Sequence, residues 1–425
     1  MTLFTTIFHN IHQWLKQKKI ALSISLMNAI IISLLSYWWN NMPILTGEKL
    51  VLFGGAEFVK DRFGINHQAP DSNVLFVNIA YDRTLVEKKN QYDLTVGNTD
   101  ITDRAKLLQF LQILDSVDTY SYIFLDVRFE KGLKAPLYDS LLFSQISKMQ
   151  RIVISNHEGM QLADTILSQK AAFNDYKSTI AVTGFTRYQY TYNNDPSMAL
   201  YAYQELKGKT IIDYCDLFYT SDKKLCYNSM FILFPIEYLD EYFAPKEYNG
   251  IVNHSEPIKK VYYNLGSDIL NPSNLPDVIT DTAFIADIAT LTKDKYIVIG
   301  NMVEDTHDTY SGKRPGPVIT YNAFKTLMDQ KHIVNLWLML LMAVVYFSIS
   351  LSQFSHKAPY LRVSFIAKSK SKFLHFTLSL IKYTFFLTII VFILNLFWDI
   401  SVSVIIPSLY FTIQKSIINY KRMKL

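Results

Sequence analysis

The longest apolar runs of the chain lie toward its two ends. One run covers Ile20–Trp38, and three more cover Val334–Ser352, Leu374–Trp398 and Ile400–Ile417. Each approaches the length of a transmembrane helix, because about 20 residues at 1.5 Å per residue span a hydrocarbon core of roughly 30 Å. The first run ends in "YWWNN", without a small-residue cleavage site, so we interpret it as a retained anchor. The pattern predicts four transmembrane helices.

Basic residues flank these runs unevenly. Lysines precede the first run, Lys and Arg follow the last, and the segment 353–373 is basic and contains no acid. Because positively charged flanks stay in the cytoplasm, we expect both termini and this segment there. The predicted organisation is a cytoplasmic amphipathic segment 1–19, a span 20–38, an extracytoplasmic (periplasmic) domain 40–332, a span 334–352, a basic cytoplasmic loop 353–373, spans 374–398 and 400–417, and a cytoplasmic tail 418–425.

Between the first two spans, short apolar runs alternate with amphipathic stretches. Asn73–Tyr81, Ser121–Val127 and Arg151–Ser155 are nearly continuous apolar runs, typical of strands buried on both faces of a parallel sheet. A helical pattern after Asp103 and another at Leu137–Met149 separate them, which predicts parallel pairing with right-handed crossovers. The predicted fold class is α/β, with a mainly parallel sheet flanked by helices in the extracytoplasmic domain, plus four transmembrane helices. Further strands are expected at Ser178–Thr183, Met230–Phe234, Lys260–Leu265 and Lys295–Gly300, further helices at Pro196–Leu206, Thr282–Thr292 and Thr320–Lys331, and an irregular region at Asp213–Ser273.

Polar residues follow the predicted strands, at the edge where open parallel sheets bind ligands. Three interpretations are open for this rim: a divalent-cation site, a carboxylate pair for acid/base hydrolysis, or helix caps and ion pairs that only hold the fold. No sequence resembles GxSxG, HExxH, a P-loop or GxGxxG, so we predict no catalytic residue, metal or cofactor. The candidates for a ligand rim are Asp82, Asp126, Arg128, Arg187, Asp305, His307 and Asp308.

Charge and cysteine content add two constraints. The net charge of +5 is too small to predict a nucleic-acid partner. The two cysteines, Cys215 and Cys226, both fall in the predicted external domain, where a disulfide closing this short loop is reasonable. Two buried thiols are the alternative.

Several segments resemble a known family in their order along the chain. "VLFVNIAYDRTL" resembles its first strand, and "YIFLDVRFE" its second strand with Asp-x-x-Phe. "YIVIGNMVEDTHDTYSGKRPGPVITYNAF" resembles the closing strand with its Gly, Asp-Thr, Pro-Gly and Asn-Ala pattern. With one span before the domain and three after it, residues 55–420 resemble the second type of CHASE domain, an extracellular sensory domain associated with bacterial cyclases and histidine kinases.

The resemblance implies a membrane-anchored sensor of the bacterial inner membrane, with its main domain in the periplasm. Such a sensor binds a small ligand or an envelope component and passes a signal through its membrane helices. The chain ends soon after the last predicted span, so we expect a separate signalling partner rather than a fused output domain. The Trp-Pro-Trp-type segment of the family is absent, and "NQYDLTVGNTD" stands in its place. The alternatives are a structural or scaffolding envelope protein and, more distantly, a metal-dependent envelope hydrolase. We expect no enzymatic activity, and the layout is compatible with a homodimer.

Overall fold

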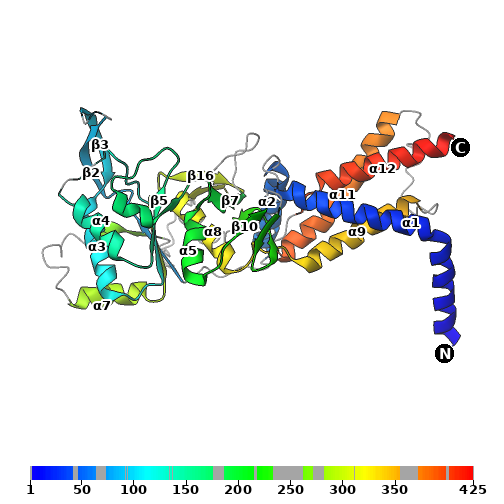
Figure 1. The fold of residues 1–425 in the computed structure, drawn as a ribbon, viewed down its shortest axis with the longest axis horizontal. Coiled ribbons are helices and arrows are strands. Elements are labelled where there is room, and N and C mark those ends of the chain that lie inside the picture. Colours follow the sequence, from blue (N-terminus) through cyan, green and yellow to red (C-terminus); the bar gives the residue numbers. More distant parts are fainter. Residues whose placement is uncertain are drawn as a thin grey trace, which may run out of the picture. The chain divides into compact units, whose positions relative to one another are not determined.

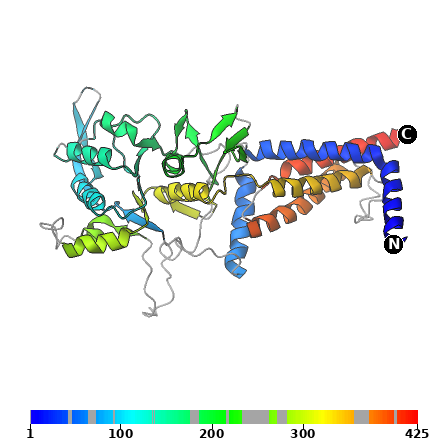
Figure 2. The same cartoon turned by 60° about the horizontal axis from the view of Figure 1, so that its bottom comes forward.

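The computed structural model divides the chain into two compact units. One unit is His67–Ile333, and the other combines Met1–Asn66 with Val334–Leu425. Figures 1 and 2 show the elements of each unit. The structure describes residues 2–41, 46–63, 73–90, 92, 94–133, 135, 137–175, 186–214, 218–232, 262–270, 282–310, 312–354, 372–398 and 402–424.

A six-stranded sheet forms the centre of the larger unit. The strand order is β14-β1-β15-β4-β5-β6, and every neighbouring pair is parallel. The predicted α/β fold with a parallel sheet is therefore confirmed. The strands are β1 (Val74–Asn78), β4 (Tyr122–Leu125), β5 (Ile152–Asn156), β6 (Ala171–Phe173), β14 (Tyr263–Asn264) and β15 (Tyr296–Gly300).

Helices cover both faces of this sheet (Figures 1 and 2). Because successive strand residues point to opposite faces, Ile123 and Leu125 of β4 join one core, and Tyr122 and Phe124 join the other. Strands with apolar side chains on both faces have to be buried on both sides. The first core contains α3 (Arg104–Val117), α4 (Asp139–Lys148) and α7 (Thr282–Thr292), and the second contains α5 (Met198–Lys207) and α8 (Gly316–Met328).

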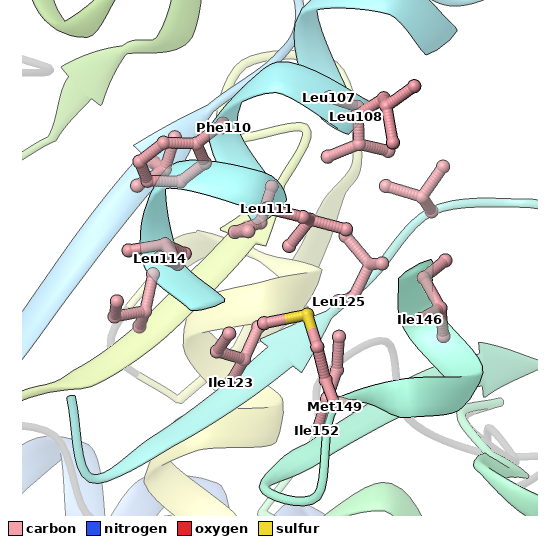
Figure 3. Close-up of a cluster of buried hydrophobic side chains, with 14 of the residues drawn as sticks. Leu107, Leu108, Phe110, Leu111, Leu114, Ile123, Leu125, Ile146, Met149 and Ile152 are labelled. Atoms are coloured by element: carbon pink, nitrogen blue, oxygen red, sulfur yellow. The ribbon is translucent and has the colours of Figure 1, made fainter. Parts of the chain in front are cut away.

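Helix α3 illustrates how the sequence positions an element. The Asp103 side chain accepts hydrogen bonds from the backbone N–H groups of Ala105 and Lys106, which caps the helix at its predicted start. Its apolar stripe, including Leu111 and Leu114, packs onto β4 (Figure 3). Truncating either leucine to Ala is expected to cost about 2–5 kcal/mol, because the surrounding core cannot fully close the cavity.

Several elements differ from the sequence-based expectations. Helix α8 begins at Gly316, earlier than the predicted Thr320. Within its described residues, the region expected to be irregular contains several short strands and the π-helical turn Leu265–Ile269. The expected strand Ser178–Thr183 lies outside the described residues. The remaining elements are β2 (Arg83–Lys89), β3 (Thr95–Thr102), η1 (Thr165–Gln169), β7 (Arg187–Gln189), β8 (Thr191–Tyr192), β9 (Asp195–Pro196), β10 (Ile212–Tyr214), β11 (Phe218–Ser221), β12 (Lys224–Cys226), β13 (Ser229–Phe231), η2 (Leu265–Ile269), β16 (Thr306–Thr309) and β17 (Gly312–Pro315).

The second unit contains the long apolar helices. Within its described parts, three segments are long and apolar enough to cross a membrane: Lys19–Trp39, Leu336–Phe354 and Phe373–Trp398. The chain is therefore a membrane-associated protein. The predicted fourth span coincides largely with α12, which is not one of these three segments, so a fourth crossing stays a prediction. The helices are α1 (Thr2–Asn41), α2 (Thr46–Phe63), α9 (Leu336–Phe354), α11 (Lys372–Trp398) and α12 (Ile405–Lys424).

Polar side chains link the helices of this second unit. Asn28 on α1 donates to the Ser350 hydroxyl on α9 at 3.0 Å and accepts from the Tyr410 hydroxyl on α12 at 2.9 Å. Gln353 on α9 donates to the Tyr383 hydroxyl on α11 at 2.9 Å. Hydrogen bonds of this kind hold apolar helices together, because lipid offers no alternative partner. The four helices therefore form one packed bundle that includes α12.

Candidate functional site

Side chains from the carboxyl ends of neighbouring strands gather at one edge of the sheet. Asp126 follows β4 directly, His157 follows β5, and Asp175 comes two residues after β6. Asp305 belongs to the loop after β15. Parallel pairing brings these ends together, as the sequence-based prediction of a polar rim requires. Of the predicted rim residues, Asp126, Asp305 and His307 meet here.

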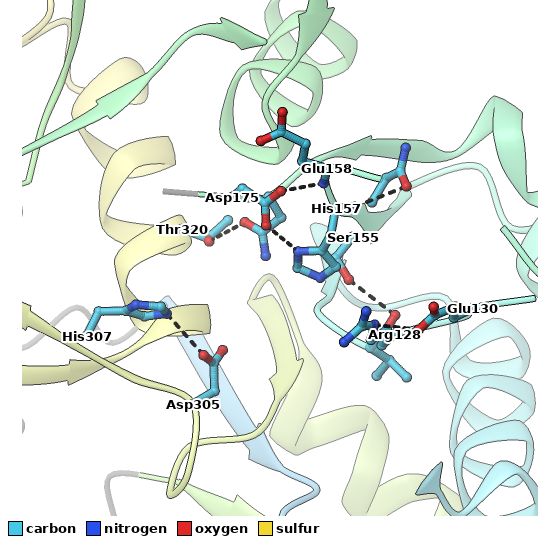
Figure 4. Close-up of polar contacts among 12 residues, drawn as sticks. Arg128, Glu130, Ser155, His157, Glu158, Asp175, Asp305, His307 and Thr320 are labelled. Carbon is cyan, nitrogen blue, oxygen red and sulfur yellow. Dashed lines mark hydrogen bonds and ion pairs between the residues drawn. The ribbon is translucent and has the colours of Figure 1, made fainter. Parts of the chain in front are cut away.

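Two His–Asp pairs form the accessible part of the site (Figure 4). His157 Nδ1 lies 2.7 Å from Asp175 Oδ1, and His307 Nε2 lies 3.0 Å from Asp305 Oδ1. The four side chains are 28–41% exposed, so solvent reaches all of them. A carboxylate that accepts a hydrogen bond from one ring nitrogen fixes the tautomer and the orientation of the imidazole. Each pair therefore presents carboxylate oxygens and an oriented imidazole ring at the accessible part of the site.

Asp126 is the least accessible of these acids. The residue as a whole is partly accessible, but its Oδ2 atom is buried and has no hydrogen-bond partner among the described residues. Burial, followed by the nearby Asp305 carboxylate, raises the pKa of Asp126 to about 6. His157 and hydrogen bonds from Asn174 and Ser155 act in the opposite direction. A buried acid held near a second acid is costly to the apo protein.

The start of helix α8 places Asp305. The backbone N–H of Gly316 donates to the Asp305 carbonyl at 2.8 Å. A Cβ atom at Gly316 would lie 2.3 Å from Asp305 Oδ2, so glycine lets this carboxylate keep its present position. The N-terminal end of the helix dipole also favours a negative charge at this point. Helix α8 thus starts directly at the site.

Neighbouring residues fix the floor of the site. Asn174, which is only 3% exposed, accepts hydrogen bonds from the Tyr188 hydroxyl at 2.7 Å and the Thr320 hydroxyl at 2.8 Å. These bonds tie the end of β6 to β7 and α8. A Cβ atom at Gly300 would lie 2.4 Å from the Pro317 ring and 3.2 Å from Asp126 Cβ. Glycine at the end of β15 therefore lets α8 pack close beside Asp126.

Asp82 is at the same sheet edge but has a structural environment. It is 4% exposed, its Oδ1 accepts from Lys106 Nζ at 2.7 Å, and its Oδ2 accepts from the Gly266 N–H at 3.0 Å. The acid thus connects β1 to α3 and η2, and both of its oxygens are satisfied.

The other predicted rim residues make contacts away from the two His–Asp pairs. Arg128 is 62% exposed and pairs with Glu130 at 2.9 Å. Arg187 on β7 donates to Asn228 and stacks over the Phe231 ring at 4.4 Å. Asp308 is exposed on β16.

The sequence-based candidate list omitted Asn174, Asp175 and His157. The signal for His157 is its place directly after an apolar strand. Asn174 and Asp175 follow β6, which has only three residues, Ala171–Phe173, too few to give a readable strand pattern.

The predicted disulfide cannot be compared with the structure in the same way. Cys215 lies outside the described residues, so its pairing with the buried Cys226 stays a prediction.

The chemistry available at the site is hydrogen bonding and charge. Among the described residues, no group of three or more His, Cys, Asp or Glu side chains could hold a metal ion. Carboxylates and imidazoles instead offer acceptors for a molecule that carries N–H or O–H donors. Comparisons of this chain with protein-family models, with curated proteins and with solved structures gave no match.

Proposed function

We propose that this chain is a membrane-anchored sensory protein whose larger unit lies outside the cytoplasm and binds a small ligand. The resemblance to CHASE domains of the second type suggests this class. In this proposal the chain has four membrane helices. The signal passes through them to a separate signalling partner. A structural or scaffolding envelope protein is the alternative.

The observation that carries the proposal is Asp126. Its Oδ2 is buried without a hydrogen-bond partner among the described residues, and Asp305 raises the pKa of this acid further. A buried carboxylate oxygen that accepts no hydrogen bond costs free energy. A ligand with amine or hydroxyl donors that turns the Asp126 carboxyl group toward itself would satisfy this oxygen and separate the two negative charges. We infer that such a donor-bearing small molecule is the ligand.

A route for the signal starts at the same site. Helix α8 begins at Gly316, beside Asp305, and ends at Met328. The chain then reaches α9 at Leu336, which is one of the three apolar membrane helices. A ligand that moves Asp305 would act on the first turn of α8. The ligand can shift the equilibrium between two positions of this helix only by the difference between its affinities for them.

Ligand binding is tested on the full chain in lipid nanodiscs by thermal unfolding. The probes are spermidine, ethanolamine and glucose, because these amines and this sugar carry the required donors. We expect at least one probe to raise the unfolding temperature of the wild type and of Asp308→Asn, an exposed-acid control, but not of Asp126→Asn. If no probe acts and Asp126→Asn is itself destabilised, the scaffolding alternative is favoured.

Sidedness is tested by reporter fusions. A fusion at Gln169 and a fusion at Ser369 should report opposite compartments, with the first outside the cytoplasm. If both fusions report the same compartment, the proposed extracytoplasmic location is wrong, whatever the thermal unfolding shows.

A further inference from the structure

The small three-stranded sheet β10–β11–β12 has two very different faces. Tyr219 and Cys226 are cross-strand neighbours and therefore share one face. Tyr219 packs against the core that contains α5 and α8, and Cys226 is 0% exposed. This face of the small sheet covers the body of the larger unit.

The opposite face is apolar although it points outward. Tyr214 and Phe218 are cross-strand neighbours, and Ile212 lies two residues before Tyr214, so all three share this face. Their exposed fractions are 49% for Ile212, 53% for Tyr214 and 45% for Phe218. An antiparallel sheet packed on one side normally presents polar residues on the other. Exposed apolar residues that gather on one face are a feature of contact surfaces.

The chain itself fixes what lies near this surface. The Tyr227 N–H donates to the His332 carbonyl at 2.9 Å, and Cys226 forms a β-bridge with Ile333. The apolar helix α9 begins at Leu336, three residues after Ile333, and three residues extend over at most roughly 10 Å. The end of β12 is therefore held close to the point where the chain enters the membrane. This constraint does not depend on which side of the membrane the unit occupies.

Residue types at the start of α9 and in the small sheet are typical of a lipid interface. Trp337, in the first turn of α9, is 80% exposed, and Trp and Tyr concentrate where helices cross the headgroup region. Tyr214 and Phe218 pair at the same end of the small sheet as Cys226. Lys223, in the turn between β11 and β12 at the far end of the sheet, is exposed and carries a positive charge of the kind that lipid phosphates attract.

We propose that the outward face of β10–β11–β12 is a membrane-contact surface. Ile212, Tyr214 and Phe218 insert among the lipid headgroups next to the entry point of α9. The occupant is the lipid surface rather than a second copy of the chain, because the short link to α9 keeps lipid within reach in every copy. This contact goes beyond ligand sensing and would exist in a structural envelope protein as well.

Photo-crosslinking of the full chain in phosphatidylethanolamine–phosphatidylglycerol nanodiscs tests this surface. The photoreactive residue p-benzoylphenylalanine replaces Tyr214 in one variant and Tyr92 in a matched control. Tyr92 is 74% exposed and lies between β2 and β3. A third variant carries it at Trp337, where contact with lipid is expected in any case. Lipid adducts are measured by mass spectrometry of the intact protein, and dimeric products by denaturing electrophoresis.

The expected result is lipid adducts at positions 214 and 337 and none at position 92. Because all three replaced residues are exposed aromatic residues and the new side chain is also aromatic, all variants should keep the wild-type unfolding temperature. Three outcomes would overturn the proposal: chain-to-chain products at position 214, lipid adducts at 337 without any at 214, or equal lipid adducts at 92 and 214.

Discussion

Asp82 and Asp126 both lie beyond the carboxyl ends of strands of the same sheet, yet their surroundings are opposite. Asp82 accepts a hydrogen bond from Lys106 and another from Gly266, so both oxygens have partners. Asp126 has a buried oxygen without such a partner in the described part of the chain, and Asp305 is its charged neighbour.

The difference shows that an acid at a strand end is not by itself a site residue. An acid with two donors stabilises the fold, whereas an acid that faces another acid destabilises it until something binds. Stability measurements can therefore separate the two roles without knowledge of the ligand.

The largest expected effect is the loss of Asp82. Asp82→Ala leaves Lys106 and the Gly266 N–H without their acceptor, which should lower the free energy of unfolding by about 2–3 kcal/mol. Urea unfolding of the full chain in detergent, followed by circular dichroism, measures this change. Asp308→Asn, at an exposed acid, serves as the control and should stay within about 0.5 kcal/mol of wild type.

Asp126 should respond in the opposite direction. Asp126→Asn removes a buried charge next to Asp305 and keeps the shape of the side chain, so stability should rise by about 1–2 kcal/mol at pH 7.5. The same urea titration applies. If Asp126→Asn instead lowers the free energy of unfolding as much as Asp82→Ala does, Asp126 is a structural acid like Asp82.

The pH dependence of stability sharpens the comparison. The pKa of Asp126 is raised from 3.8 to about 6, so the folded state binds more protons than the unfolded state between these values. Asp126 should therefore add roughly 2 kcal/mol of stability as the pH falls from 7 to 4. Asp126→Asn should lack this gain, and an unchanged pH profile in the variant would contradict the assignment.

A second buried group, His332, opposes the gain in stability that Asp126 gives at low pH. His332 is 0% exposed between the Tyr190 and Tyr203 rings, and burial lowers its pKa from 6.5 to about 4. Its contribution is fully present above pH 6.5 and is lost as the pH falls toward 4. In His332→Phe the stability should therefore rise more clearly as the pH falls, because only the effect of Asp126 remains. The double variant with Asp126→Asn should show a flatter dependence of the free energy of unfolding on pH than either single variant.

The smallest expected effect is at the start of α8. In Gly316→Ala the new methyl group collides with Asp305 Oδ2, the mobile end of a partly exposed side chain, so the cost should be about 1 kcal/mol or less. The displaced carboxylate should lower the pKa of Asp126 toward its ordinary value. Gly300→Ala should cost more, because its neighbour there is the ring of Pro317. The pH profile of unfolding measures both variants.

Hydrophobic pattern alone determined the main elements. The three apolar helices, the parallel strands β1, β4, β5 and β15 and the capped helix α3 were all predicted, because burial on both faces or in lipid leaves a direct record in the residue types. The ribbon β2–β3 was not predicted, because its residues are largely exposed and its pattern is weak.

Only the tertiary structure decided which polar residues act together. The residues Asp82, Asp126 and Asp305 are equivalent in the sequence, each an acid after an apolar strand. Their neighbours come from other elements of the fold: Gly266 for Asp82, Asn174 for Asp126 and Gly316 for Asp305. Hydrogen bonding and desolvation depend on distances of a few ångströms, which the order of residues along the chain does not contain.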